Sequence, residues 1–152
     1  MSQAHPSQAS AVQGMSPGTL ILFTMAVALS TFMEVLDTSI ANVAVPTIAG
    51  NLGASANDGT WVISSYGLAA AIVVPMTGWI ARRYGQVKVF VCSVLLFTLA
   101  SALCGIATSL PMLVGFRFLQ GLVSGPMVPL SQTLMLSNFP PQKRGMAMAL
   151  WS

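Results

Sequence analysis

The sequence WVISSYGLAAAIVVPMTGW, residues 61–79, contains no charged side chain and begins and ends on tryptophan. In an α-helix, which rises about 1.5 Å per residue, Trp61 and Trp79 lie about 27 Å apart. That distance is close to the hydrocarbon thickness of a bilayer, about 30 Å, and tryptophan rings favour the two membrane–water interfaces. This stretch therefore predicts a transmembrane helix with an aromatic residue at each membrane surface.

Three further apolar stretches flank this segment, at about residues 20–45, 89–106 and 112–136. Of the 152 residues, 55% are hydrophobic and only 6% are charged, and the mean hydropathy is +0.78. A soluble domain of this length would carry far more charge on its surface. Each stretch supplies the roughly 20 residues that a spanning helix needs. We predict an all-α transmembrane bundle with four complete helices.

The two ends of the chain differ from these stretches. Residues 1–19 are rich in Ser, Gln, Ala and Pro, which predicts a disordered tail, and Ser16 and Pro17 offer a helix start. A cleaved signal peptide is disfavoured, because the tail lacks Lys and Arg and the apolar run after it is too long and contains two acids. Residues 20–152 are expected to form the first part of the bundle, including a fifth helix that starts near Met146 and is cut short after about two turns.

The loops between the predicted helices indicate an orientation. Asp58 is the only charged residue in the loop before residue 61, and the turn at residues 108–111 has none. Cytoplasmic loops are rich in Lys and Arg, so the positive loops are expected to face the cytoplasm together with the N-terminal tail. The cations lie in two short loops without a basic face, which argues against nucleic-acid binding. They are Arg82, Arg83, Lys88, Lys143 and Arg144.

Polar side chains form a stripe on each of two predicted helices. On the first helix they recur at spacings of three and four residues, and on the fourth at i, i+3, i+4 and i+7, so each set shares one helix face. Polar groups inside a membrane face protein or water rather than lipid. The first stripe comprises Ser30, Thr31, Glu34, Asp37 and Thr38, and the second comprises Arg117, Gln120, Gly121 and Ser124.

The three charged members of these stripes lie at different depths. Taking Pro46 and Leu110 as the outer ends of the two helices places Asp37 about 13 Å deep. On the same scale Arg117 lies about 10 Å deep and Glu34 about 18 Å. If the two helices are neighbours, Asp37 and Arg117 can pair, either as a structural ion pair or as part of the function. Glu34 is then left without a partner, and a buried carboxyl group away from a cation is the better candidate for a proton carrier.

Small residues and prolines indicate close packing and bends. Gly121 and Gly125 are four residues apart on the fourth helix, as are Gly67 and Ala71 on the second, and this spacing lets helices approach closely. Prolines inside the spans, which bend helices and leave carbonyl groups without their usual donors, are Pro75, Pro126 and Pro129.

The sequence carries no constellation typical of an enzyme. His5 is the only histidine and lies in the tail, and no glycine-rich loop precedes a Lys-Ser or Lys-Thr pair. We expect neither a catalytic site nor a metal or other cofactor.

Several local sequences resemble signatures of the EmrB/QacA-type drug:proton antiporters of the major facilitator superfamily. LDTSIANVAVP at residues 36–46 resembles the first-helix signature of that branch, and GWIARRYG at residues 78–85 resembles the superfamily's loop motif between helices two and three. RFLQG at residues 117–121 is similar to the fourth-helix motif. WVISSY at residues 61–66 and PPQKRG at residues 140–145 extend the resemblance over nearly everything after the tail.

Two positions depart from the family pattern. Arg82 stands where the loop motif usually has Asp, so the usual acid-dependent latch between the two halves of the transporter is not expected. Val123 replaces the second Gly of the fourth-helix motif, while Ser124 and Gly125 remain small. The candidate residues of the conformational loop motif are Gly78, Arg82, Arg83 and Gly85.

The resemblance implies proton-coupled export of amphipathic drugs or toxic compounds across the bacterial inner membrane by alternating access. The Arg of the family's fourth-helix motif is associated with proton coupling, so Arg117 joins Glu34 and Asp37 as a proton-coupling candidate. A periplasmic adaptor and an outer-membrane channel are implied as partners. In that fold helices one and four line a central cavity. The resemblance therefore implies that the cavity is lined by Ser30, Thr38, Gln120 and Ser124.

Two alternatives stay open. One is a facilitator for another small solute, such as a sugar or an organic acid, although the first-helix signature favours the drug-exporting branch. The other is a non-transporting or truncated membrane protein, because the substrate site of such transporters lies between two halves and 152 residues supply only part of one half.

Overall fold

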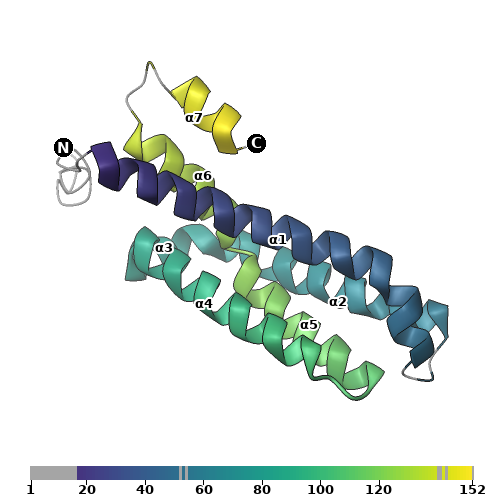
Figure 1. The fold of residues 1–152 in the computed structure, drawn as a ribbon. Coiled ribbons are helices and arrows are strands. Elements are labelled where there is room, and N and C mark those ends of the chain that lie inside the picture. Colours follow the sequence, from purple (N-terminus) through teal and green to yellow (C-terminus); the bar gives the residue numbers. More distant parts are fainter. Residues whose placement is uncertain (1–16, 52, 54, 140–141, 143, 152) are drawn as a thin grey trace.

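The computed structural model describes residues 17–51, 53, 55–139, 142 and 144–151, and every regular element in these ranges is helical (Figure 1). The predicted all-α fold class is confirmed. Residues 1–16 of the predicted tail lie outside the described residues. The elements are α1 (Pro17–Asn51), α2 (Ala56–Val73), the 3-10 turn η1 (Val74–Met76), α3 (Thr77–Tyr84), α4 (Gln86–Gly105), α5 (Leu110–Ser124), α6 (Met127–Asn138) and α7 (Arg144–Trp151).

Within the described ranges, four helical stretches are long and apolar enough to cross a membrane, as predicted. The second stretch combines α2, η1 and α3, and the fourth combines α5 and α6. With eight residues, α7 is too short to cross. The four stretches are Ile21–Asn51, Asn57–Tyr84, Gln86–Gly105 and Leu110–Ser137.

Two of the spans are interrupted at prolines, in agreement with the sequence. In the second span, Pro75 lies in the 3-10 turn between α2 and α3. In the fourth span, Pro126 lies between the end of α5 at Ser124 and the start of α6 at Met127. Proline has no backbone N–H to donate, so the helical hydrogen-bond pattern changes at both places.

The prediction that the first helix ends at Pro46 is wrong. α1 continues through this residue to Asn51, because a proline removes one backbone hydrogen bond while the other bonds of the helix persist. Asp37 therefore lies about 21 Å from the end of α1, instead of the expected 13 Å or so. Arg117 still lies about 10 Å from the start of α5 at Leu110. Since the two side chains meet, α1 extends beyond α5 at this end of the bundle.

The helix α5 packs between α2 on one side and α4 on the other. Its closest approach is to α2 at Gly121, where a Cβ atom would lie 2.8 Å from the Cβ of Ala69 and would also meet the backbone oxygen of Tyr66. Gly125 approaches the same helix, so the close packing predicted from these two glycines is confirmed. Gly67, in contrast, has nothing within 4 Å, so the second predicted small-residue pair mediates no packing among the described helices.

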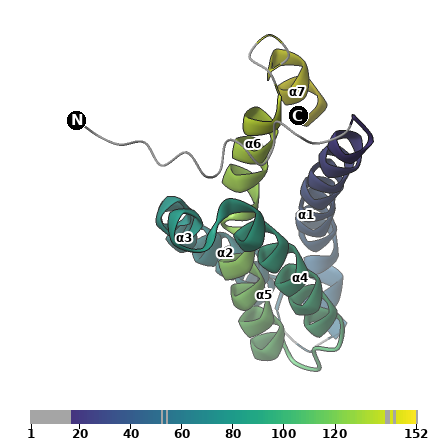
Figure 2. The ribbon, with the colours of Figure 1, turned by 90° about the vertical axis from the view of Figure 1, so that its left-hand side faces the viewer.

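The long helix α1 packs on the rest of the bundle towards its two ends. Figure 1 shows α1 running the length of the molecule, over α2 at one end and beside α6 at the other, and Figure 2 shows it separated from α3. Towards the N-terminus, Val27 joins an apolar cluster that includes Phe97 of α4. Towards the C-terminus, Val45 packs with Val62 of α2 and Leu113 of α5. The middle of α1 carries its polar stripe between these two apolar contacts.

Candidate functional site

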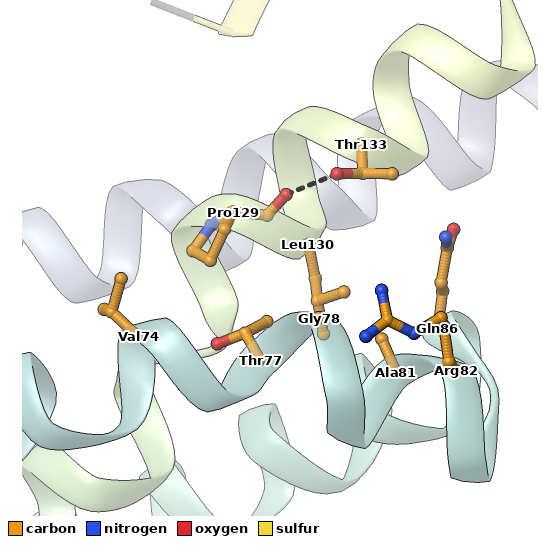
Figure 3. A pocket seen from close by; sticks show the side chains of 9 residues that line it. All are labelled: Val74, Thr77, Gly78, Ala81, Arg82, Gln86, Pro129, Leu130 and Thr133. Carbon is orange, nitrogen blue, oxygen red and sulfur yellow. Dashed lines mark hydrogen bonds between the residues drawn. The ribbon is translucent and has the colours of Figure 1, made fainter.

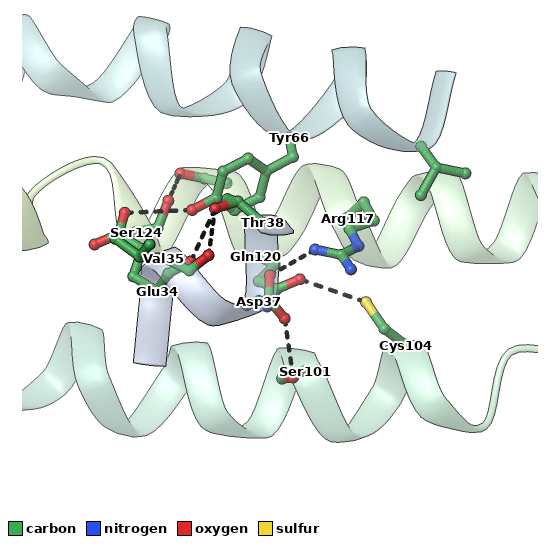
Figure 4. Close-up of polar contacts among 12 residues, drawn as sticks. Glu34, Val35, Asp37, Thr38, Tyr66, Ser101, Cys104, Arg117, Gln120 and Ser124 are labelled. Atoms are coloured by element: carbon green, nitrogen blue, oxygen red, sulfur yellow. Dashed lines mark hydrogen bonds and ion pairs between the residues drawn. The ribbon is translucent and has the colours of Figure 1, made fainter. Parts of the chain in front are cut away.

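Polar side chains from four helices meet beside the middle of α1 (Figure 4). The two acids of α1 are three residues apart and so lie on the same face of the helix, about one turn from each other. Residues of α2, α4 and α5 face them. We call this set the polar cluster; it contains Glu34, Asp37, Tyr66, Ser101, Cys104, Arg117, Gln120 and Ser124.

An ion pair joins α1 to α5 within the polar cluster. Arg117 Nη1 donates to Asp37 Oδ2 at 2.6 Å, and the Arg117 and Asp37 side chains are only 10% and 13% exposed. Ser101 Oγ of α4 donates to the other carboxylate oxygen at 3.4 Å. The predicted pairing of Asp37 with Arg117 is confirmed, and the carboxylate also ties α1 to α4.

Glu34 lies one turn nearer the N-terminus and binds a neutral group. Tyr66 Oη of α2 donates to Glu34 Oε1 at 3.3 Å, and Ser124 of α5 lies beside this hydroxyl (Figure 4). Glu34 Oε2 is buried without a hydrogen-bond partner, and no Lys or Arg of the described residues pairs with this carboxyl group. The expectation that Glu34 has no partner is therefore wrong in part: it has no counter-charge, but Tyr66 binds it.

Gln120 and Ser124 lie in the helix interfaces of the bundle. Gln120 is fully buried, and its Oε1 accepts a long, weak hydrogen bond from Cys104 Sγ at 3.6 Å. Ser124 is 1% exposed and donates to the Gly121 carbonyl at 3.1 Å. Two buried donors, Gln120 Nε2 and Arg117 Nε, have no partner among the described residues. The cavity-lining role of Gln120 and Ser124 stays a prediction.

The other two predicted cavity residues bond to their own helix. Ser30 Oγ donates to the Ala26 carbonyl at 2.8 Å. Thr38 Oγ1 lies 3.2 Å from the Glu34 carbonyl and 2.9 Å from the Val35 carbonyl. Both side chains are half-buried on the same stripe of α1 as the acids, and their hydrogen bonds among the described residues go to backbone carbonyls of α1.

The loop-motif residues lie around the end of α3, outside the polar cluster. Gly85 alone joins α3 to α4 with φ of 92°, a conformation that a residue with a side chain rarely adopts, so this position requires glycine. Arg82 and Arg83 are exposed and form no ion pair within the described residues. Gly78 and Arg82, but not Arg83, line a shallow groove of about 270 Å³ between α3 and α6, opposite Thr133 (Figure 3).

Three members of the polar cluster were not identified from the sequence. Tyr66 lies within the WVISSY motif, and a buried tyrosine hydroxyl usually has a hydrogen-bond partner, which was a usable signal. Ser101 and Cys104 are three residues apart on one face of α4, a pattern too weak to separate from ordinary packing. All three supply contacts from the second and third spans, between the two predicted stripes.

The polar cluster has the chemistry of proton exchange and ion pairing. It contains two carboxylates at neighbouring turns, one with a guanidinium partner and one with a hydroxyl partner. Among the described residues no group of His, Cys, Asp and Glu is placed to hold a metal ion.

The chain is similar in sequence to known membrane transporters over most of its length. The family model of the Major Facilitator Superfamily matches residues 27–152. The multidrug export protein EmrB of Haemophilus influenzae is 61% identical over 135 residues, which cover 89% of this chain and 26% of the relative. The protein of the same name from Escherichia coli K12 is 58% identical over 133 residues, covering 88% of this chain and 26% of the relative.

A relative with a different name is similar over the same region. The fatty acid resistance protein FarB of Neisseria gonorrhoeae is 56% identical over 129 residues, which cover 85% of this chain and 25% of the relative. The chain thus spans about a quarter of the length of the relatives it matches.

Proposed function

The chain belongs to the major facilitator superfamily, and from this premise we propose that it is the first part of an inner-membrane transporter that exports amphipathic toxic compounds in exchange for protons. The names of the relatives, multidrug export and fatty acid resistance, support this class of substrate. The observation that carries the proposal is the polar cluster, which sets two carboxylates and a guanidinium inside spans that are otherwise apolar. Ionisable groups at such positions are costly and mark ion or proton pathways.

The two acids divide the work in this proposal. Asp37 is held by Arg117 and Ser101, so its charged form has a counter-charge and two donors. Glu34 has one neutral donor and a second oxygen without a partner. A carboxylate without a counter-charge is costly inside a membrane, and binding a proton removes its charge. We therefore assign proton loading to Glu34, and to the Asp37–Arg117 pair the task of joining α1 to α5 during the cycle.

The membrane potential gives this assignment a driving force. Moving one charge through 100 mV is worth about 2.3 kcal/mol, so an acid that loads from outside and unloads inside can drive export. Alternating access requires helices that rearrange, which the proline interruptions at Pro75 and Pro126 support. The Lys and Arg residues of the loops support a cytoplasmic N-terminus. The proposal also includes a periplasmic adaptor and an outer-membrane channel as partners, which the resemblance to the EmrB/QacA-type exporters implies.

Substitution of the two acids tests the proposal in the complete transporter that contains this chain. In inverted membrane vesicles energised with a proton gradient, Glu34→Gln is expected to abolish dye transport while dye binding persists, because the amide cannot release a proton. Asp58→Asn is the matched control, since Asp58 is exposed at the start of α2 and outside the polar cluster. Proton coupling that survives Glu34→Gln would refute the assignment of proton loading to Glu34. Coupling that also survives Asp37→Asn would refute a role of either acid in proton coupling.

A further inference from the structure

We infer that Tyr66 is the positioning residue of Glu34. Its hydroxyl group holds the ionised carboxylate of α1 against the packed helices α2 and α5, which we call the α2–α5 unit, and this contact weakens when the carboxyl group takes up a proton. The role of Tyr66 in transport rests on the proposed function, whereas the contact between Tyr66 and Glu34 does not. The Tyr66 ring packs against the apolar cluster at α4 and α6, and its hydroxyl donates to Glu34 Oε1 at 3.3 Å (Figure 4).

Tyr66 is fixed in place by the close packing of α2 on α5. Its backbone oxygen lies so close to Gly121 that a Cβ atom on that glycine would clash with it. The adjacent turn of α2 brings Ala69 within 2.8 Å of the same position. Because there is no room at this contact, Tyr66 keeps its position relative to Arg117, which lies one turn before Gly121 on α5.

α1 is bound to this α2–α5 unit by two polar contacts that are one turn apart. Asp37 binds Arg117 through a charged hydrogen bond, and Glu34 binds Tyr66. A hydroxyl group donates a stronger hydrogen bond to an ionised carboxylate than to a neutral carboxyl group. Proton uptake by Glu34 therefore weakens one of the two contacts that hold the middle of α1, while the ion pair persists.

The surroundings of Glu34 leave Tyr66 as the group best placed for this task. The other ionisable groups of the polar cluster are Asp37 on α1, Arg117 on α5 and Cys104 on α4, and none of them is hydrogen-bonded to Glu34. α6, which packs against α1 nearer its N-terminus, has no charged residue. Among the side chains from other helices, Tyr66 is thus the one whose removal should change the protonation of Glu34.

The test measures protonation of Glu34 directly, in the complete transporter in lipid. Infrared spectra recorded across a pH series follow the carbonyl band of protonated carboxyl groups, and the band that disappears in Glu34→Gln belongs to Glu34. Tyr66→Phe removes only the hydroxyl group and is expected to move the midpoint of this band to higher pH by about one unit, because the ionised carboxylate loses a donor. Tyr84→Phe is the matched control, since Tyr84 is the other tyrosine of these 152 residues and is exposed at the end of α3.

An unchanged midpoint in Tyr66→Phe would overturn the inference. If Tyr66→Phe does not accumulate as folded protein, replacing Tyr66 with 3-fluorotyrosine, a stronger donor, should move the midpoint in the opposite direction. Dye transport by the same samples separates the two proposals. A shifted midpoint in a protein whose transport ignores the proton gradient would sustain the role of Tyr66 and refute the proposed function.

Discussion

The α2–α5 interface and the middle of α1 are held in different ways. At the α2–α5 interface the contact is steric: Gly121 brings two backbones together without space for a methyl group. At the middle of α1 the contacts with α2 and α5 are polar, through Asp37 and Glu34, and the buried apolar residues Val27 and Val45 lie on either side of them. Packing without gaps cannot be switched by a proton, whereas a hydrogen bond to a carboxyl group can.

This difference suggests a division between frame and moving part. The frame is α2, α4 and α5, whose contacts are extensive. In this interpretation α1 is the moving part, because it has apolar side chains exposed along its outer face and a polar face towards the frame. The comparison is tested by substitutions that loosen each region separately.

The largest effect is expected from breaking the ion pair. Arg117→Met leaves the buried Asp37 carboxylate without its counter-charge and should destabilise the protein by about 3–5 kcal/mol. The measurement is the midpoint of unfolding in detergent. The double variant Asp37→Leu/Arg117→Met removes both charges and should recover most of the loss. If the double variant is as unstable as the single one, the loss comes from missing packing of the two side chains and not from the unpaired charge of Asp37.

A smaller loss is expected at the steric contact. Gly121→Ala places a methyl group against the Tyr66 carbonyl and Ala69, and such overpacking costs about 1–3 kcal/mol. Gly67→Ala is the matched control one residue beyond Tyr66, because nothing lies within 4 Å of Gly67. The same unfolding assay should show the control unchanged or slightly stabilised, since alanine favours helix. Equal behaviour of the two variants would show that α2 and α5 are not close-packed in the membrane.

The smallest effect is expected at the edge of the polar cluster. Ser101→Ala removes one long hydrogen bond, 3.4 Å, to Asp37 while the ion pair remains. The expected loss of stability is about 0.5–1.5 kcal/mol. Thr98→Ala on the same helix is the control, because the exposed Thr98 hydroxyl bonds only to the Val94 carbonyl of its own helix. A loss at Ser101 no larger than at Thr98 would mean that α4 does not hold the carboxylate.

The spans and the ion pair could be predicted from the sequence because they depend on local quantities. Hydropathy and the spacing of Trp61 and Trp79 locate the helices, since a bilayer fixes the length of a crossing. The similar depths that followed from the assumed helix ends indicated Asp37 and Arg117 as partners, and their opposite charges inside apolar spans supported the pairing. The depth scale itself was wrong at Pro46, because a single missing backbone bond does not decide whether the rest of a helix continues.

The hydroxyl partner of Glu34 could not be predicted in the same way. Periodicity shows which residues share a face of one helix, but it does not give the rotation of that face relative to another helix. The contact of Gly121 with the backbone of Tyr66 sets the rotation of α2 relative to α5, and the contact of Tyr66 with Glu34 also depends on how α1 packs on α2, so both are properties of helices together. The glycine spacing indicated a close approach without identifying α2 as its partner.

The 3-10 turn η1 has a consequence for the angular phase of the second span. Each residue of a 3-10 helix advances by about 120° around the axis, compared with about 100° in an α-helix, so three such residues rotate α3 by about 60° relative to a straight continuation of α2. In α3, Thr77 and Ala81 are buried, while Trp79 is exposed. The buried face of the span therefore does not continue in one line along residues 61–79. A prediction of buried residues that uses one α-helical period for the whole span would place residues beyond Pro75 on the wrong face of the helix.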